Sequence, residues 1–162
     1  MIGLVGDTGR LVFPSTTVDT VNAYLELLKT GINMQEIYGG MYAKSIKEIK
    51  IIKHVYENTK VTKAGLGYFY FKDQDLKKLK IHPDEVVKYL PLLANYNEIK
   101  IFASITEDVS RGIFRVSIRS GNIIINQVAQ KFNGGGHKHA AGAKVKNIKE
   151  SKQLLAALDR LI

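Results

Sequence analysis

The chain has 162 residues, with 24 Lys and Arg against 15 Asp and Glu, so its formal net charge is +9. A hydrophobic content of 45% excludes a disordered basic tail, and the absence of cysteine excludes a disulfide scaffold, a thiolate zinc site and a cysteine nucleophile. The basic excess is mostly lysine and favours partners such as nucleic acids, nucleotides or phosphates, although a basic surface without a ligand explains it about as well.

Nothing in the sequence predicts a membrane segment. No apolar run approaches the roughly 20 residues that a transmembrane helix needs. The apolar start of the chain lacks a basic region and soon meets glycine and Asp7, so we expect no signal peptide. These features lead us to expect a soluble cytoplasmic protein without a membrane partner.

The first forty residues predict one strand and two helices. Residues 2–5 are short, apolar and partly β-branched, and the breakers after them predict a buried strand ending in a loop that carries Asp7. Apolar residues at helical spacing predict helices over 18–31 and 34–38, the second ending at the glycine pair that follows. This piece is too small to bury both faces of a strand, so it has the character of a remnant of a larger domain.

Ser45 and Glu48 form a capping box that predicts a third helix, continuing to Tyr56. One side of this helix carries a row of lysines: Lys44, Lys47, Lys50 and Lys53. Such a row is typical of a solvated helix face, and a dedicated anion-binding role is the less favoured alternative.

From about residue 58 to the end, strands and helices alternate, which predicts the α/β class and an independent domain. The predicted strands are 63–71, 99–105, 113–119 and 140–146, and the predicted helices are 73–80, 83–93, 123–132 and a C-terminal helix that includes Leu154 to Leu161.

The run Gly134–Gly136, followed by His137, is the strongest candidate for a ligand site. Consecutive glycines let the backbone approach a ligand and turn N–H groups toward an anion. Lys138 and His139 add hydrogen-bond donors, and the small residues 140–142 leave room for a flat or bulky ligand. The alternative is a helix C-cap with a flexible turn, for which one glycine would suffice.

The strand predicted over 113–119 is the second candidate. Its alternation places Arg115, Ser117 and Arg119 on one face, where two arginines beside a serine suit a phosphate or a carboxylate. The alternative is the solvent-facing side of an antiparallel strand. Asp7 is a third candidate, either as a metal ligand at the end of a strand or, more commonly, as an Asx-turn residue.

These motifs together resemble the DHH-family phosphoesterases. GGGHKHAAG resembles the signature of the DHH-associated domain, the C-terminal substrate-binding domain of that family, and FRVSIRS upstream of it fits the same pattern. GLVGDTGRLVFPSTT resembles the last metal-binding motif of the preceding catalytic domain. The nearest resemblance is to the NrnA-like oligoribonuclease and pAp phosphatase group, with RecJ exonuclease and cyclic dinucleotide phosphodiesterases more distant.

The resemblance implies a two-manganese centre that activates water for attack on a phosphoester, with Asp7 as one metal ligand. It also implies a set of residues that hold the phosphate or nucleotide end of the substrate: Arg119, Ser120, Gly134, Gly135, Gly136 and His137, with Ala141 and Gly142 giving close approach. Strand geometry adds Arg115 as a helper. The chain has no Asp-His-His triplet, and one ligand cannot make a two-metal centre.

We therefore expect a small mixed β-sheet domain with flanking helices, preceded by a remnant of an α/β catalytic domain. Residues 1–42 would be that remnant, 43–58 a connecting helix and 59–162 the DHH-associated domain. The N-terminal DHH domain would be a missing partner, and the chain by itself would bind short single-stranded oligonucleotides or pAp without hydrolysing them.

Two other functions remain open from the sequence. One is a free-standing nucleic-acid or nucleotide-binding module, which the net charge and the glycine run both suit. The other is the related C-terminal domain of alanyl-tRNA synthetases, which the DTGR motif disfavours. The choice among RNA, DNA, pAp and cyclic dinucleotides, and the formation of a homodimer, also stay open.

Overall fold

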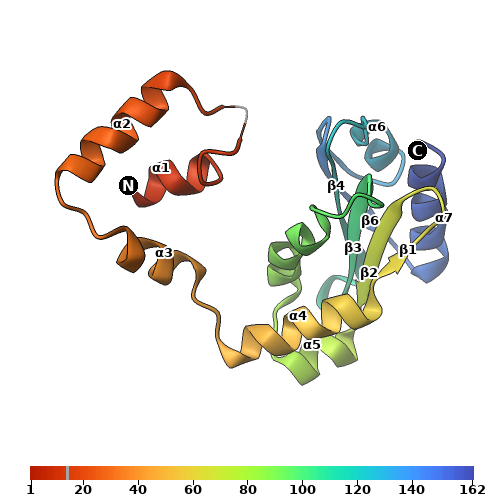
Figure 1. The fold of residues 1–162 in the computed structure, drawn as a ribbon. Helices are drawn as coiled ribbons and strands as arrows, with labels where there is room; N and C mark the ends of the chain where they lie inside the picture. Colours follow the sequence, from red (N-terminus) through yellow and green to blue (C-terminus); the bar gives the residue numbers. More distant parts are fainter. Residues whose placement is uncertain (14) are drawn as a thin grey trace. The chain divides into compact units, whose positions relative to one another are not determined.

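The computed structural model of the chain describes residues 1–13 and 15–162 and divides into two compact units, Met1–Ser45 and Ile46–Ile162 (Figure 1). Pro14, which belongs to the segment GLVGDTGRLVFPSTT, lies outside the described residues. Among the described residues, no helix is both long and apolar enough to cross a membrane.

The first unit contains the helices α1 (Ile2–Asp7), α2 (Val18–Lys29) and α3 (Met34–Tyr42). The strand predicted over residues 2–5 is wrong, because these residues form α1. A strand satisfies its backbone groups through a neighbouring strand, and the described part of this unit offers none, whereas a helix satisfies them locally. Asp7 is therefore the exposed last residue of a helix and does not sit in a loop after a strand.

The helix α3 continues through Gly39 and Gly40 to Tyr42, beyond its predicted end. The rings of Tyr38 and Tyr42 lie 5.7 Å apart, one helical turn from each other, and this contact helps to extend the helix past the glycines. Asn33 begins α3, with its side chain accepting a hydrogen bond from the backbone of Gln35. Neither α2 nor α3 has a buried residue among those described.

The second unit, all of whose residues are described, contains a six-stranded sheet in the order β1-β2-β3-β4-β6-β5. Its strands are β1 (Lys60–Val61), β2 (Leu66–Phe71), β3 (Ile101–Asp108), β4 (Ile113–Ser120), β5 (Gly135–His137) and β6 (Ala140–Val145). The β2–β3 pair is parallel and the other pairs are antiparallel. The α/β class and the mixed sheet with flanking helices are thus confirmed.

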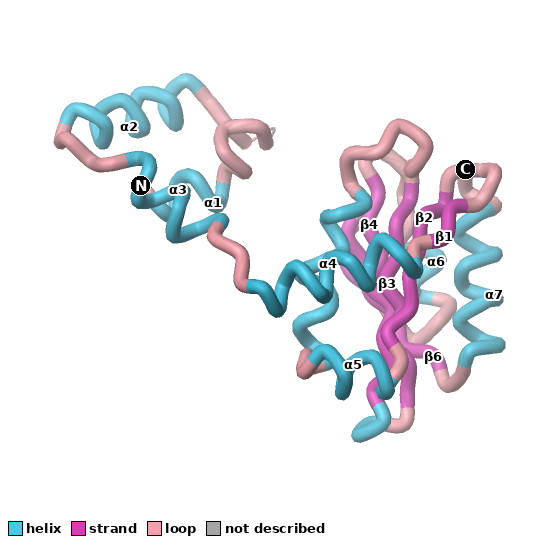
Figure 2. The backbone as a smooth tube through the Cα atoms, turned by 60° about the horizontal axis from the view of Figure 1, so that its bottom comes forward, coloured by secondary structure: helices cyan, strands magenta, loops and turns pink. Residues whose placement is uncertain are grey.

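Helices cover both faces of this sheet (Figure 2). One face carries α4 (Ile46–Asn58), α5 (Asp73–Leu79) and the 3₁₀ helix η1 (Pro83–Leu93), and the other carries α6 (Asn126–Gln130) and α7 (Ile148–Asp159). A short 3₁₀ turn, η2 (Val109–Arg111), joins β3 to β4.

The two faces are covered to different extents. The core under α6 and α7 receives buried side chains from β2, β3, β4 and β6. In the core under α4, α5 and η1, the buried strand residues are Phe69 and Phe71 of β2, and Phe102 of β3 packs against them. In the described structure β4, β6 and β5 add no buried apolar residue to that second core. We call their side of the sheet the open face.

Candidate functional site

The register of the strands brings small and basic residues together on the open face. Ser117 of β4 lies opposite Gly142 of β6, and Gly142 lies opposite Gly135 of β5. Arg115 lies opposite Lys144 on one side of this row. On the other side, a second row runs from Arg119 through Ala140 to His137.

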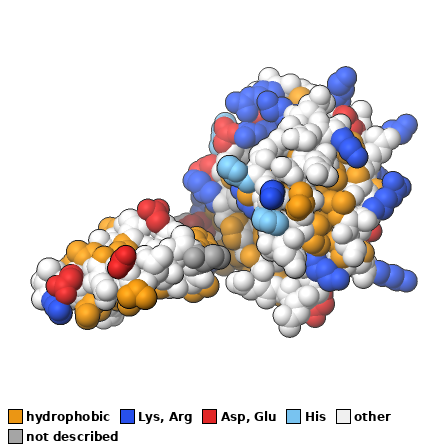
Figure 3. Space-filling view, turned by 90° about the horizontal axis from the view of Figure 1, so that it is seen from above, with side chains coloured by type: hydrophobic (Ala, Val, Ile, Leu, Met, Phe, Trp, Pro, Cys, Tyr) orange, Lys and Arg blue, Asp and Glu red, His pale blue; other side chains and the backbone are white. Residues whose placement is uncertain are grey.

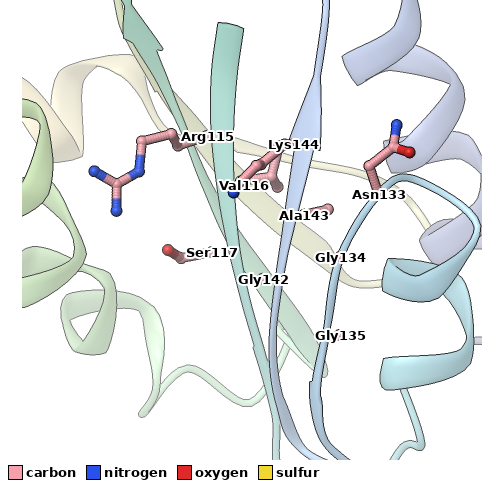
Figure 4. A pocket seen from close by; sticks show the side chains of 9 residues that line it. All are labelled: Arg115, Val116, Ser117, Asn133, Gly134, Gly135, Gly142, Ala143 and Lys144. Atoms are coloured by element: carbon pink, nitrogen blue, oxygen red, sulfur yellow. The ribbon is translucent and has the colours of Figure 1, made fainter. Parts of the chain in front are cut away.

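A groove of about 390 Å³ lies along the first row, and we call it the glycine groove. Its lining includes Arg115, Ser117, Gly135, Gly142 and Lys144. Figure 4 shows Arg115 and Ser117 projecting from β4 to the same side, with Gly135 beside Gly142. The groove thus has basic and hydroxyl groups along its sides and a floor formed by backbone.

The glycines serve two different purposes. A Cβ at Gly134 would lie 2.0 Å from the carbonyl oxygen of Gly142, so this close approach of two chain segments requires glycine. Gly136 has a φ of +127°, a backbone conformation that residues with a side chain rarely adopt. Gly135 has no atom within 4 Å of its ideal Cβ position, and Gly142 would make only an ordinary contact at 3.5 Å. The first pair is needed for the fold, and the second pair leaves room above the floor.

The glycine run was expected to form a loop, and the structure shows that most of it is the edge strand β5. It pairs with β6 through a two-residue turn, Lys138-His139. Backbone hydrogen bonds tie this turn to the end of β4 and to the segment after it, from Ser120 N to His139 O at 3.1 Å and from Ile125 N to Lys138 O at 2.8 Å. The floor of the groove is therefore held by the sheet and by this segment.

Ser120 and Ala141 lie away from the groove. The hydroxyl of Ser120 donates to the carbonyl oxygen of Ile123 at 2.5 Å, and Nδ1 of His139 lies 3.1 Å from the same oxygen. Ala141 is 4% exposed and belongs to the core under α6 and α7. Strand alternation places both residues on the face opposite to Arg119 and Gly142. Their contacts there support the structure around the groove.

Arg119 and His137 remain accessible on the open face. Arg119 is half-buried, and its Nη1 donates to the carbonyl oxygen of Ile118 at 2.9 Å, which fixes the side chain along β4. Its guanidinium keeps further donors for a ligand. His137 is exposed at the edge of the sheet.

Arg115 is already paired with a carboxylate. It forms an ion pair with Asp84 of η1, and Arg111 lies 3.9 Å from the same carboxylate. The neighbouring Asp108 accepts from Ser110 Oγ at 2.6 Å and pairs with Arg111 at 3.2 Å, and these contacts lower the pKa of Asp108, the Ser110 hydrogen bond most of all. Sequence reasoning identified Asp84 only as part of a helix start, because the contact spans elements far apart in the chain.

Two polar residues of the groove, Lys144 and Asn133, were missed by the sequence reasoning. Lys144 had a usable signal, because two-residue alternation along the predicted strand 140–146 places it on the same face as Gly142. Asn133 had none, since its position depends on the left-handed turn (φ 52°) that leads into the glycines.

Asp7 belongs to the first unit, whereas all residues that line the glycine groove belong to the second. Within residues 1–13 and 15–162 there is no group of three or more His, Cys, Asp or Glu side chains that could hold a metal ion. The donor set of the described residues therefore does not fit a two-metal centre.

Comparison with known proteins places this geometry in a family. Residues 58–162 match the DHHA1 domain. The chain is 30% identical to the "Bifunctional oligoribonuclease and PAP phosphatase NrnA" of Bacillus subtilis over 98% of its own length and 50% of that protein. It is 29% identical to the "Probable bifunctional oligoribonuclease and PAP phosphatase NrnA" of Streptococcus mutans over 99% of its length and 51% of the relative.

The chain thus spans about half the length of the curated relatives that it matches. Among solved structures, an exopolyphosphatase-related protein from Bacteroides fragilis has the same fold with a TM-score of 0.83 at 23% identity, covering 98% of this chain and 48% of the other. From the match over residues 58–162, which takes in the whole sheet and the glycine groove, we conclude that the chain belongs to the DHHA1 domain family.

Proposed function

We propose that the glycine groove binds the phosphate-bearing end of a short oligonucleotide or of pAp, as the substrate-binding part of a phosphoesterase. The observation that carries this proposal is the backbone floor of Gly135 and Gly142, with Ser117 and Lys144 lining the groove. Arg119 lies in the neighbouring row on the same face of the sheet. The names of the relatives, which describe oligoribonucleases and PAP phosphatases, favour this function over a free-standing binding module.

Each group has a role that follows from its chemistry. A phosphate needs several hydrogen-bond donors and positive charge, and Arg119, Lys144 and the Ser117 hydroxyl supply both. The glycine floor lets the ligand approach the backbone closely. Arg115 contributes less direct charge, because Asp84 already occupies it, and a phosphate would have to compete with that carboxylate.

Hydrolysis would need groups beyond this chain's described residues. Asp7 is the one candidate metal ligand that the sequence motif supplies, and a two-manganese centre would take its other ligands from an N-terminal DHH domain. We therefore expect the purified 162-residue chain to bind nucleotides without manganese-dependent turnover. Robust, manganese-dependent release of phosphate from pAp by this chain would contradict the expectation.

The proposal is tested by titrating pAp and a dinucleotide into the wild-type chain and into Arg119→Ala. We expect the variant to bind about tenfold more weakly or worse, because a charge-assisted hydrogen bond is lost. Arg160→Ala is the matched control, since Arg160 is an exposed arginine at the end of α7. Equal affinities for the two variants would reject the groove as the binding site.

A further inference from the structure

A second groove lies between α4 and α5, on the helices that cover the other half of the same sheet face. It has a volume of about 320 Å³ and is lined by Lys47, Lys50, Lys78, Leu79 and Lys80. We call it the lysine groove. No acidic residue of the described structure lines it, and its lining consists of four lysines and one leucine.

Three of these lysines lack a carboxylate partner. Other lysines on the same helices are paired, Lys53 with Glu57 at 3.6 Å and Lys77 with Asp73 at 2.5 Å. Across the described ranges, no ion pair involves Lys50, Lys78 or Lys80. No ion pair holds these three charges, and like charges that line one groove repel one another, so a bound anion would be favourable there.

The backbone at Lys80 adds a second, independent observation. Lys80 ends α5 in the left-handed conformation, with φ 52° and ψ 45°. Glycine adopts this conformation at lower cost and is the usual residue at such a helix end. A lysine here is less stable than a glycine would be, and its side chain is the fourth lysine that lines the groove.

An adjoining hollow shares Lys50 and Lys78 with the lysine groove, but Glu57 and Asp75 also line it, so the region without carboxylates is the lysine groove itself. His54 lines this hollow, and its Nδ1 lies 3.3 Å from the Asn58 amide nitrogen, which can only donate. Nδ1 therefore accepts, so the neutral ring carries its proton on Nε2. That nitrogen is buried without a hydrogen-bond partner, and the Asp75 carboxylate is 4.0 Å away.

We propose that the lysine groove binds backbone phosphates of a single-stranded oligonucleotide longer than the glycine groove can hold. This rests on the proposed function of the glycine groove. Lysines act as point charges for phosphate, and the lining has no arginine or aromatic side chain to read a base, so the contact is independent of sequence. Both grooves belong to one face of the sheet, the lysine groove on the helices over β2 and β3 and the glycine groove over β4, β6 and β5.

A competing explanation is that Lys78 and Lys80 only stabilise the C-terminal end of α5 through the helix dipole. In that case their removal would lower the melting temperature without affecting binding. The single variant Lys80→Gly separates the two explanations, because it relieves the left-handed backbone while it removes one charge. We expect it to keep or raise the melting temperature and to weaken binding of the longer strand.

The decisive experiment measures the affinity of the 162-residue chain for pAp and for a labelled single-stranded RNA of about 12 nucleotides. The test variant is Lys50→Gln with Lys78→Gln and Lys80→Gly. The control is Lys60→Gln with Lys149→Gln and Lys152→Gln, which removes the same charge from exposed positions on β1 and α7. At about 50 mM salt we expect the test variant to bind the RNA roughly tenfold more weakly, with a salt slope smaller by about 2 and an unchanged affinity for pAp.

The possible outcomes are distinguishable. Equal losses of RNA affinity in the test and control variants, or no loss in the test variant, would overturn the lysine groove as a phosphate site. Displacement of the RNA by polyglutamate as effectively as by unlabelled RNA would overturn its assignment to nucleic acid. If Arg119→Ala changes neither affinity while the test variant loses RNA binding, the proposed function of the glycine groove fails and the lysine groove stands.

Discussion

At the scale of single residues, we expect the stability of the fold and the binding of a ligand to depend on different glycines of the run Gly134–Gly136. Gly135→Ala places a methyl group in open space above the floor, so we expect the free energy of unfolding to change by less than about 0.5 kcal/mol. The same methyl group would occupy the position proposed for the ligand, and we therefore expect a clear loss of pAp affinity. Chemical denaturation and nucleotide titration of the same variant measure the two effects.

Gly134→Ala is the comparison. Its Cβ would overlap the carbonyl oxygen of Gly142 at 2.0 Å and approach the Cα of Ala143 at 2.6 Å. Because both are backbone atoms, the strands must move apart, and we expect a destabilisation of about 1–3 kcal/mol. A Gly135→Ala variant that binds pAp as tightly as the wild type would show that the ligand does not use this floor.

Asp108 is expected to make the stability of the second unit depend on pH in the acidic range. The hydrogen bond from Ser110, and further the charge of Arg111, lower the pKa of Asp108 below the ordinary value of an aspartate. A carboxylate with a lowered folded-state pKa contributes stability above its unfolded pKa and loses it as the pH falls through the folded value. We therefore expect Asp108→Asn to lower the melting temperature at pH 7, with the difference from wild type shrinking below about pH 4. A difference that stays constant down to pH 2 would contradict this.

Strand alternation, read from the sequence, predicted correctly that Arg115, Ser117 and Arg119 share a face. The same alternation places Ala141 and Gly142 on opposite faces of the sheet, so they cannot both face a ligand. The resemblance to the family motif assigned both residues to the substrate, because it does not take strand alternation into account. The pairing of Arg115 with Asp84 could not be predicted, because it depends on how η1 packs on β3, the strand next to β4.

At the scale of elements, the β5–β6 hairpin depends on the segment that follows β4. Ser120→Ala removes the hydroxyl that bonds to Ile123, and we expect a loss of about 0.5–1.5 kcal/mol together with faster amide exchange in β5. Arg119→Ala, by contrast, should weaken binding and leave exchange in β5 unchanged. If Ser120→Ala weakened pAp binding with no effect on stability or exchange, the hydroxyl would be a ligand contact after all.

Helices and strands with internal support were predictable, and those that depend on a neighbour were not. The β4 pattern and the apolar spacing of α4 and α7 each specify an element locally. Residues 2–5 looked like a strand only because short apolar runs do not distinguish a strand from a helix. The strand β5 is recognisable only through its partner β6, since three residues rich in glycine have little strand propensity.

At the scale of the molecule, the two units differ in how much core they have. Of the described residues, Val5 and Thr8 are the buried ones in the first unit, whereas the second unit has two apolar cores. We expect hydrogen exchange to be fast throughout residues 1–45 and slowest in β3 and β4, measured by mass spectrometry on the whole chain. Comparable protection in α2 and in β3 would contradict this expectation.

The charge is also divided unequally. Residues 1–45 contain three of the 24 Lys and Arg and four of the 15 Asp and Glu, so the positive excess belongs entirely to the second unit. Figure 3 shows Lys and Arg side chains at many separate points of one side of the molecule. The net charge therefore indicates only that the second unit is the one suited to an anionic partner. The two grooves indicate where on that unit phosphates would bind.

The floor of the glycine groove has a consequence for redesign. Because that floor is main chain, it offers no side chain to exchange, and its contribution to a ligand is the same for every phosphate that reaches it. A change of preferred ligand must therefore come from the surrounding positions, such as Ser117, Asn133 and Lys144. Variation at these three positions, with the glycines retained, is the route by which one scaffold would acquire different specificities.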